Sequence, residues 1–170
     1  MEQTNDIDAL MARIQAQETE YEFDCIDEKL AFQMGVYVVR RATEIGKPVA
    51  VRVTLGRRTL FSCSMPGTRP ESGEWLRRKE NLVYVSASSS YYWECWCEKG
   101  PHPLEWRGLD YKDYAPAGGC FPLRVKGAGM VGTLGITGML SHEDHGLAYE
   151  TVAKAVAGEL DVDVSGLGIF

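Results

Sequence analysis

The chain has 170 residues, enough for one domain that buries about 70 % of its unfolded surface without disulfide or metal staples. Its 24 acidic and 18 basic residues give a net charge of −6, which disfavours a general nucleic-acid binder. The polar start MEQTND lacks the features of a signal peptide, and no apolar run approaches the roughly 20 residues of a membrane span. The five cysteines, without a secretory leader, indicate free thiols, so we expect a cytoplasmic protein with neither nucleic-acid nor membrane partners.

The first part of the chain predicts two helices with a short strand between them. Apolar residues recur at helical spacing near the start, and we assign an N-terminal helix to residues 1–18. Thr19–Phe23 alternates and predicts a short strand. A longer helix then begins at Asp24 or Asp27 and ends at Gly46.

Four further strands are predicted in two pairs. Val49–Leu55 and Thr59–Met65 alternate apolar and polar residues and flank a short turn, as in a hairpin. Phe121–Val125 and Met130–Thr137 flank a Gly-rich turn and form the second hairpin. Glycines fall on both faces of Met130–Thr137, which predicts close packing on both sides, so we expect this hairpin to be the centre of a covered sheet.

The helices expected around these hairpins complete a layered fold. They are Glu74–Ser86, Tyr91–Glu98 and His142–Ala157, while Lys99–Leu109 is irregular and residues 159–170 form a C-terminal tail. Antiparallel hairpins with helices before and after them predict an α/β (α+β) fold in one domain spanning residues 1–170. We expect an α-β-α sandwich with about five antiparallel strands.

Several short motifs, taken in their order along the chain, resemble one family. They are Trp75 with Arg77-Arg78-Lys79, Ser89-Ser90-Tyr91, Gly108-Leu109-Asp110, Asp113-Tyr114-Ala115, Gly118-Gly119, Phe121-Pro122, Val131-Gly132 with Gly138, and Asp144-His145. This pattern resembles the UPF0303 branch of the haem-degrading-domain (HbpS-like, GlcG-like) family from about Phe23 to Ala157. The resemblance implies a profilin-like fold, symmetric homo-oligomers, and binding or turnover of haem or another tetrapyrrole.

One position departs from the pattern that the resemblance implies. Family members carry His directly before the double glycine, and this chain has Ala117 there. Imidazole is a natural iron ligand, whereas alanine coordinates nothing, so the departure weakens haem as an expected cofactor. Residues 93–106 are also richer in Trp and Cys than the family pattern.

The candidate ligand-binding residues combine positive charge, glycine backbone and aromatic rings. Arg and Lys side chains bind carboxylates, exposed N–H groups of glycines bind anions, and aromatic rings form walls for flat ligands. For each group a purely structural explanation stays open: a solvated helix face, a tight turn, or core and interface packing. The candidates are Trp75, Arg78, Lys79, Tyr92, Gly118, Gly119 and Phe121.

His145 and Asp144 are the candidate catalytic pair. His145 stands in the first turn of the last predicted helix, where the helix N-terminus should lower the pKa of its imidazole and keep it neutral at pH 7, ready to act as a base. The alternative is an ordinary helix start, where carboxylates favour the dipole. No metal site is predicted, because His142 with His145, and Cys95 and Cys97 with His102, lack the usual zinc spacings.

Three functions stay open. The favoured one is a pocket protein that binds or turns over a flat, anionic organic ligand, with haem or a tetrapyrrole implied by the resemblance. The alternatives are a cofactor-independent enzyme acting by acid/base chemistry on a small aromatic or carbonyl substrate, and an oligomeric interaction protein without a ligand. We expect the site in a cleft between the start of the last helix, the Gly118-Gly119 turn and the helix with Arg78 and Lys79, where Lys79→Ala should weaken binding with little loss of stability.

Overall fold

A four-stranded antiparallel sheet forms the centre of the molecule, with the strand order β2-β1-β4-β3. Residues 2–100 and 103–170 are described by a computed structural model, residues 2–5 by their backbone alone. The strands are β1 Ala50–Leu55, β2 Arg58–Ser64, β3 Cys120–Val125 and β4 Gly129–Thr137. Both predicted hairpins are therefore present.

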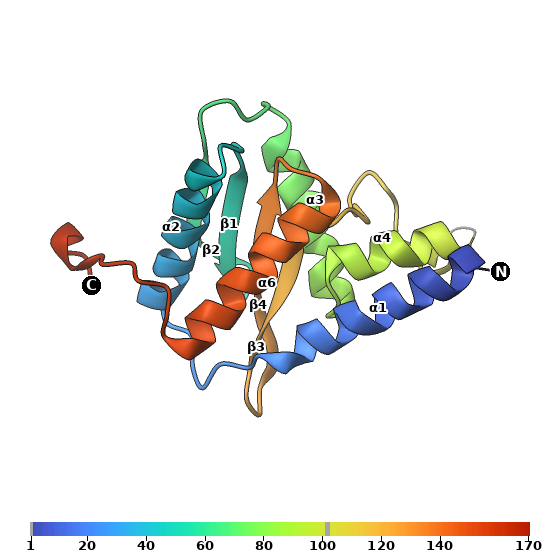
Figure 1. The fold of residues 1–170 in the computed structure, drawn as a ribbon, viewed down its shortest axis with the longest axis horizontal. Coiled ribbons are helices and arrows are strands. Elements are labelled where there is room, and N and C mark those ends of the chain that lie inside the picture. Colours follow the sequence, from blue (N-terminus) through green and yellow to red (C-terminus); the bar gives the residue numbers. More distant parts are fainter. Residues whose placement is uncertain (1, 101–102) are drawn as a thin grey trace.

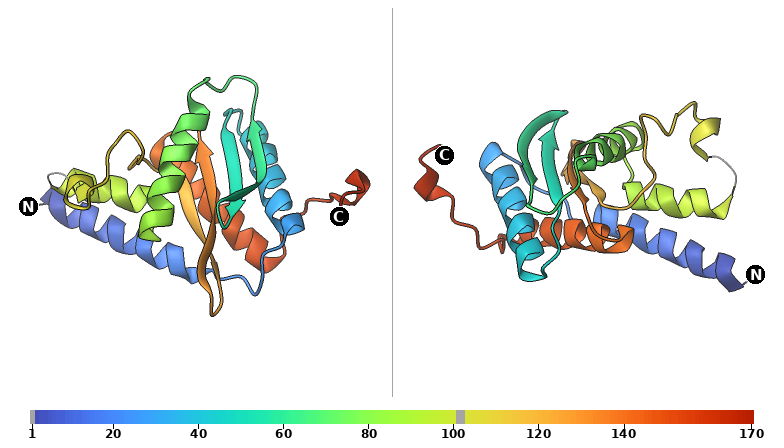
Figure 2. Two further views of the ribbon diagram at one scale, coloured as in Figure 1. Left: turned by 180° about the vertical axis from the view of Figure 1, so that it is seen from behind. Right: turned by 90° about the horizontal axis from the view of Figure 1, so that it is seen from above.

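Helices cover both faces of this sheet, which confirms the α-β-α sandwich. In Figure 1 the helices α2 and α6 lie across the front of the sheet, and the view from behind in Figure 2 shows α3 on the opposite face. The helices α1 and α4 lie side by side at the end of the molecule that carries the N-terminus. The bounds are α1 Glu2–Glu20, α2 Glu28–Glu44, α3 Ser72–Ser86, α4 Ser90–Lys99, α5 Pro103–Trp106 and α6 Ser141–Ala157.

The two faces of strand β4 pack differently. Leu134 and Ile136 are fully buried in the main core, which α2 and α6 cover. On the other face Gly135 lies against α3, where an added Cβ would come within 3.2 Å of Leu76 Cδ2. A residue without a side chain therefore lets α3 approach the sheet closely.

The predicted fifth strand is wrong, because α1 continues through Thr19 to Glu20. Phe23 alone forms a bridge: its N–H donates to Arg124 O, its carbonyl accepts from Lys126 N, and both distances are 2.9 Å. Its side chain is buried in the main core. The alternating residues Thr19–Phe23 thus span the end of α1 and a single residue, Phe23, that is hydrogen-bonded to the outer edge of β3. The second predicted hairpin consists of β3 and β4. Because β3 is the edge strand, only β4 lies at the centre of the sheet.

The residues after α6 run along α2 before they leave the body. Gln33 Nε2 donates to Val162 O at 2.7 Å, and Arg40 donates to the carbonyl oxygens of Leu160 and Asp161. A short 3₁₀ turn at Ser165–Leu167 then projects from the body, as Figure 1 shows. The predicted tail is therefore fixed to α2 at its base.

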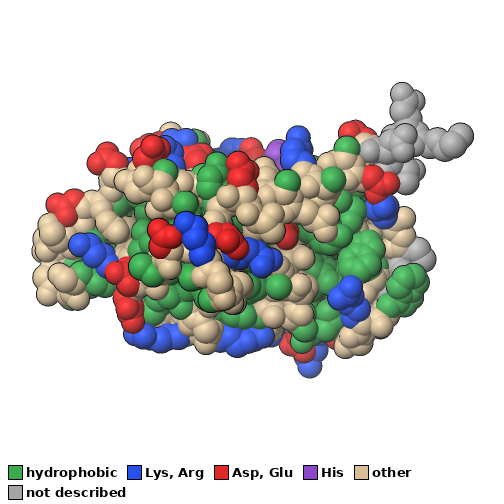
Figure 3. All heavy atoms as spheres, turned by 90° about the horizontal axis from the view of Figure 1, so that it is seen from below, with side chains coloured by type: hydrophobic (Ala, Val, Ile, Leu, Met, Phe, Trp, Pro, Cys, Tyr) green, Lys and Arg blue, Asp and Glu red, His purple; other side chains and the backbone are tan. Residues whose placement is uncertain are grey.

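The surface mixes charges of both signs. On the face shown in Figure 3, basic and acidic side chains are interspersed, and hydrophobic side chains gather toward one end. Trp106 is the most exposed of the described large apolar residues, at 79 %. None of the described helices combines the length and apolarity needed to cross a membrane.

Candidate functional site

A cavity of about 270 Å³ lies between the loop that follows β2, the first turn of α3 and the turn between β4 and α6. We call it the Trp75 pocket. Its wall from the loop and α3 includes Thr68, Arg69, Glu71, Ser72 and Trp75. Its wall from the β4–α6 turn consists of Thr137, Gly138 and Met139.

Trp75 gives this pocket a flat aromatic surface next to positive charge. The indole is 37 % exposed, and the Arg78 guanidinium carbon lies 4.3 Å from the ring centroid, within cation–π range. Arg78 also donates to Tyr111 O at 3.2 Å, which fixes the guanidinium. Arg69 lies 3.8 Å from Glu71, but both side chains are largely exposed, so this ion pair is weak.

The β4–α6 turn depends on glycine. Gly138 has a φ of +145°, and an added Cβ would lie 2.5 Å from Pro48 O. A side chain at this position would therefore meet strain and a clash at once. At Gly138 the pocket wall is therefore bare backbone.

Behind the pocket, Lys79 of α3 meets Asp144 of α6 in the interior. The Lys79 ammonium donates to Gly118 O at 2.5 Å and to Ile136 O at 3.2 Å, and lies 3.6 Å from Asp144 Oδ2. Burial lowers the pKa of Lys79 and raises that of Asp144, while the opposite charge of each partner counteracts the shift of the other. Two carbonyl oxygens accept hydrogen bonds from the ammonium and a carboxylate lies beside it, so we assign a charged pair.

Lys79 is thus not the accessible cation that the sequence suggested, since it is only 3 % exposed. Because it is buried and paired, we expect its removal to cost stability, and this expectation replaces the one drawn from the sequence. The burial of Lys79 was not predicted, because its charged neighbours Arg77 and Arg78 made this part of α3 resemble a solvent-exposed face. The useful signal was its spacing: Lys79 follows Leu76 by three residues and precedes Leu82 by three, on the buried face of α3.

The double glycine packs closely rather than opening a cradle for an anion. The Gly118 N–H donates to Glu94 Oε2 at 2.6 Å, and an added Cβ at Gly118 would lie 2.3 Å from Ser141 O. Gly119 has a φ of +120°, and its added Cβ would lie 2.2 Å from Ile136 O. The turn is therefore glycine-rich because α6 and β4 leave no room for side chains.

His145 is buried between rings of Tyr91 and Phe121, whose centroids lie 5.1 and 5.5 Å from its own. Its Nε2 lies 3.1 Å from Gln17 Oε1, and its buried Nδ1 has no partner among the described residues. Burial, aided by the positive charge of Arg13, lowers the pKa of His145 to about 4. A pKa of about 4 corresponds to a neutral imidazole at pH 7, with burial rather than the helix N-terminus as the main cause.

The predicted catalytic pair is not assembled in this structure. Asp144 faces Lys79 and accepts the N–H of Met139 at 3.2 Å, while His145 points into the aromatic core. Tyr92 and Phe121 likewise lie outside the lining of the Trp75 pocket: Tyr92 packs against Trp96, and Phe121 is buried against His145.

The three segments expected to form the site do converge, but the Lys79–Asp144 pair fills the space between them. The open pocket lies beside that convergence, where the predicted residue Trp75 lines it. Sequence reasoning missed Arg69, Ser72 and Met139, because no spacing pattern links a loop, a helix start and a distant turn.

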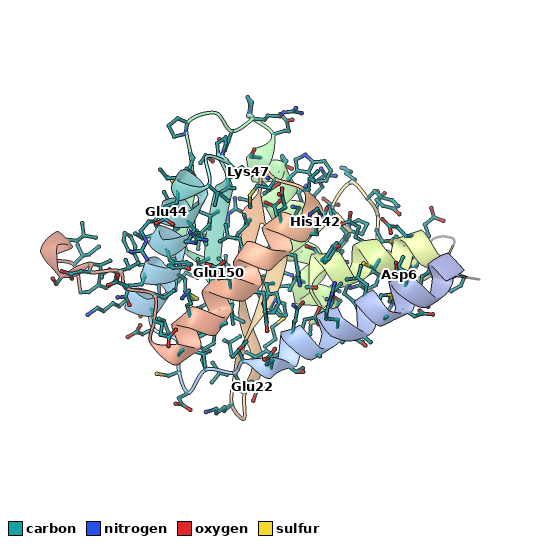
Figure 4. The ribbon with its side chains drawn as sticks, viewed as in Figure 1. Asp6, Glu22, Glu44, Lys47, His142 and Glu150 are labelled. Carbon is teal, nitrogen blue, oxygen red and sulfur yellow. The ribbon has the colours of Figure 1, made fainter. Side chains whose placement is uncertain are left out.

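No group of three His, Cys, Asp or Glu side chains within the described ranges is placed to hold a metal ion. His142 is exposed at the start of α6, as Figure 4 shows, whereas His145 is buried; His102 lies outside the described residues. In the Trp75 pocket Met139 is the one soft donor of the described lining. The lining therefore does not fit a haem iron held by His or Cys.

Solved structures of other proteins share this fold. The crystal structure of the Ybr137w protein matches with a TM-score of 0.80 and 24 % identity, covering 89 % of this chain and 90 % of that one. A PduOC:heme complex matches with a TM-score of 0.60 and 21 % identity, covering 71 % of this chain and 88 % of that one. At these identities the likeness shows the fold alone.

The family follows from the sequence. The family model described as "Haem degrading protein HbpS-like" matches residues 26–153. A UPF0303 protein of Rhizobium johnstonii is 39 % identical over 155 residues, which cover 91 % of this chain and 96 % of that protein. The chain belongs to the HbpS-like family, which confirms the resemblance drawn from its motifs.

Proposed function

We propose that the protein binds a small, flat, carboxylate-bearing organic molecule in the Trp75 pocket. The observation that carries this proposal is the half-exposed indole of Trp75, which has the Arg78 guanidinium 4.3 Å from its ring and Arg69 in the same pocket lining. The family description names haem degradation, and haem is itself a flat molecule that bears carboxylates. This shared chemistry supports the ligand class.

The pocket matches such a ligand in both shape and charge. An aromatic face packs against a flat molecule, and a guanidinium binds a carboxylate through paired N–H groups. Glu71 is the acid that such a carboxylate would displace from Arg69, and their 3.8 Å exposed contact offers little resistance. The volume of about 270 Å³ is near the lower end for ligand pockets, so a tetrapyrrole would enter by one edge only.

Binding is proposed without a catalytic group. Glu71 is the one carboxylate of the described lining, which contains no imidazole, and His145 does not contribute to it. Acid/base catalysis, the alternative from the sequence, would need a proton-transfer group within hydrogen-bond reach of the ligand. The pocket geometry therefore favours a binding protein over an enzyme driven by His145.

The test is calorimetric titration with benzoate, naphthalene-2-carboxylate and protoporphyrin IX, each with its uncharged amide or ester. We expect saturable binding of at least one carboxylate and at least tenfold weaker binding of its uncharged counterpart. Trp75→Ala and Arg69→Ala should each raise the Kd at least tenfold. Trp106→Ala is the matched control, since Trp106 is exposed and lies outside the pocket. Unchanged affinity in Trp75→Ala would refute the proposed site.

A further inference from the structure

We infer that the buried Lys79–Asp144 pair is a brace that sets the width of the Trp75 pocket, so both residues are positioning residues for its ligand. The inference rests on the proposed function for what is bound, but the brace itself belongs to the chain alone. Neither residue is part of the pocket lining.

One end of the brace belongs to the helix that carries the aromatic wall. Lys79 follows Trp75 by four residues on α3, and residues at this spacing lie one above the other on the same side of a helix. The position of the Lys79 ammonium therefore fixes how the helical turn of α3 that carries Trp75 is placed and rotated relative to the sheet.

The other end of the brace holds the opposite wall of the pocket, which the β4–α6 turn provides. Asp144 Oδ1 accepts the N–H of Met139 at 3.2 Å. Gly138 and Met139 line the pocket. The ion pair at 3.6 Å therefore connects the α3 wall to the β4–α6 wall through two side chains.

Two further segments are built around this connection. Lys79 donates to Gly118 O and Ile136 O, which ties the double-glycine turn and the end of β4 to the same ammonium. An added Cβ at Gly119 would lie 2.8 Å from Asp144 Cβ and 3.1 Å from Lys79 Nζ. The glycine makes the space that the brace occupies.

The stability of the fold does not by itself explain why an ion pair occupies these two buried positions. Well-packed apolar residues of similar volume often replace a buried ion pair without loss of stability. An apolar pair, however, offers no acceptor to the Met139 N–H in the β4–α6 turn. Charge at these positions therefore preserves the geometry of that turn more than the stability of the fold.

The test compares two double variants that each remove an ion pair from α3. Lys79→Met/Asp144→Leu removes the brace, and Arg52→Met/Glu80→Leu removes the 3.4 Å pair that joins α3 to β1. We expect both variants to keep the wild-type circular dichroism spectrum. Amide hydrogen exchange in residues 137–140 should accelerate at least tenfold in the brace variant and stay within twofold of wild type in the control.

The second measurement is binding of whichever aromatic carboxylate the wild type binds best. Its Kd should rise at least tenfold in the brace variant and stay unchanged in the control. Wild-type exchange at residues 137–140 in the brace variant would overturn the inference. If the wild type binds no carboxylate, the proposed function fails, and the exchange measurement still decides whether the brace exists.

A single variant tests the charge of the brace separately from its hydrogen bond to the β4–α6 turn. Asp144→Asn keeps an acceptor for the Met139 N–H but removes the negative charge opposite Lys79. We expect exchange in residues 137–140 to accelerate at least threefold, with a matching loss of affinity. Wild-type exchange in Asp144→Asn would contradict the brace.

Discussion

Lys79 and Asp144 place opposite charges 3.6 Å apart in the interior, with side chains only 4 % and 2 % exposed. Each charge is tolerated there because the other is present and because backbone groups complete its hydrogen bonds. Removing one partner therefore has a different consequence from removing both, and the first prediction uses this difference.

Lys79→Met should lower the free energy of unfolding by about 3–5 kcal/mol, because it leaves the Asp144 carboxylate buried without its cation. Urea denaturation followed by circular dichroism measures this loss. Lys126→Met, which removes an exposed pair with Asp24, should leave the urea midpoint unchanged. Wild-type stability in Lys79→Met would mean that the interior pair is not charged.

Gly119→Ala should destabilise the fold by about 3 kcal/mol or more, because a φ of +120° adds backbone strain and the new Cβ would meet Ile136 O at 2.2 Å. Gly127→Ala is the matched control: it also has a positive φ, of +74°, but its added Cβ meets no atom within 4 Å. The control should lose about 1 kcal/mol from strain alone. Equal losses in the two variants, measured by thermal or urea unfolding, would contradict the packing of the double glycine.

His145 should make stability depend on pH between about 4 and 6.5. Its pKa falls from 6.5 to about 4 on burial, so in this window the unfolded state binds a proton that the folded state does not. Stability therefore falls as pH decreases, by about 2 kcal/mol from this group between pH 7 and pH 5. Above pH 7 the group is neutral in both states and contributes no slope.

The control for this prediction is His145→Phe, which keeps an aromatic ring between Tyr91 and Phe121 but cannot bind a proton. Urea titrations at pH 5 and pH 7 should show a smaller pH dependence in the variant by that same amount. An identical pH dependence in both proteins would show that His145 titrates normally. The carboxylates contribute the same pH dependence to the wild type and to the variant, so their contribution cancels in the comparison.

Haemin should bind the unmodified chain without a sharp six-coordinate absorption spectrum, because Ala117 and the described pocket lining offer neither imidazole nor thiolate to iron. Ala117→His should strengthen binding and sharpen the Soret band. Absorption titration measures both proteins. A tight, well-defined Soret shift in the unmodified chain would show that another side chain holds the iron.

The chain should form a symmetric homo-oligomer. This prediction comes from the resemblance to the family and from large apolar side chains exposed in the protomer, among them Ile45, Trp106 and Leu140. Light scattering at micromolar concentration should give a mass that is twice the protomer mass or a larger whole multiple of it. A clean protomer mass would reject the prediction.

The parts of the fold that local patterns specify were predictable. Alternation within Val49–Leu55 and the paired faces of Met130–Thr137 depend on the twofold period of a strand, and both hairpins are present. Thr19–Phe23 was mispredicted because five alternating residues also fit the last turn of a helix. Only the tertiary position of Phe23 against β3 separates these alternatives.

The site was only partly predictable, since its residues come from segments that meet through long-range packing. Trp75 and the convergence of α3, α6 and the double glycine were anticipated. The burial of Lys79 was not, because a run of three cations looks like a solvated face until the apolar spacing around it is considered. Arg69 and Met139 carry no local signal at all.

The single bridge at Phe23 makes the two edges of the sheet unequal. It occupies the outer edge at the end of β3 through hydrogen bonds to Arg124 and Lys126, whereas no strand of the described chain lies beyond β2. A sheet with two free edges can recruit further copies without limit, which is a route to fibres. The edge of β2 is therefore the more open of the two to strand addition, because Phe23 protects only the edge of β3. The residue that anchors the chain just after α1 thus shields one side of the sheet.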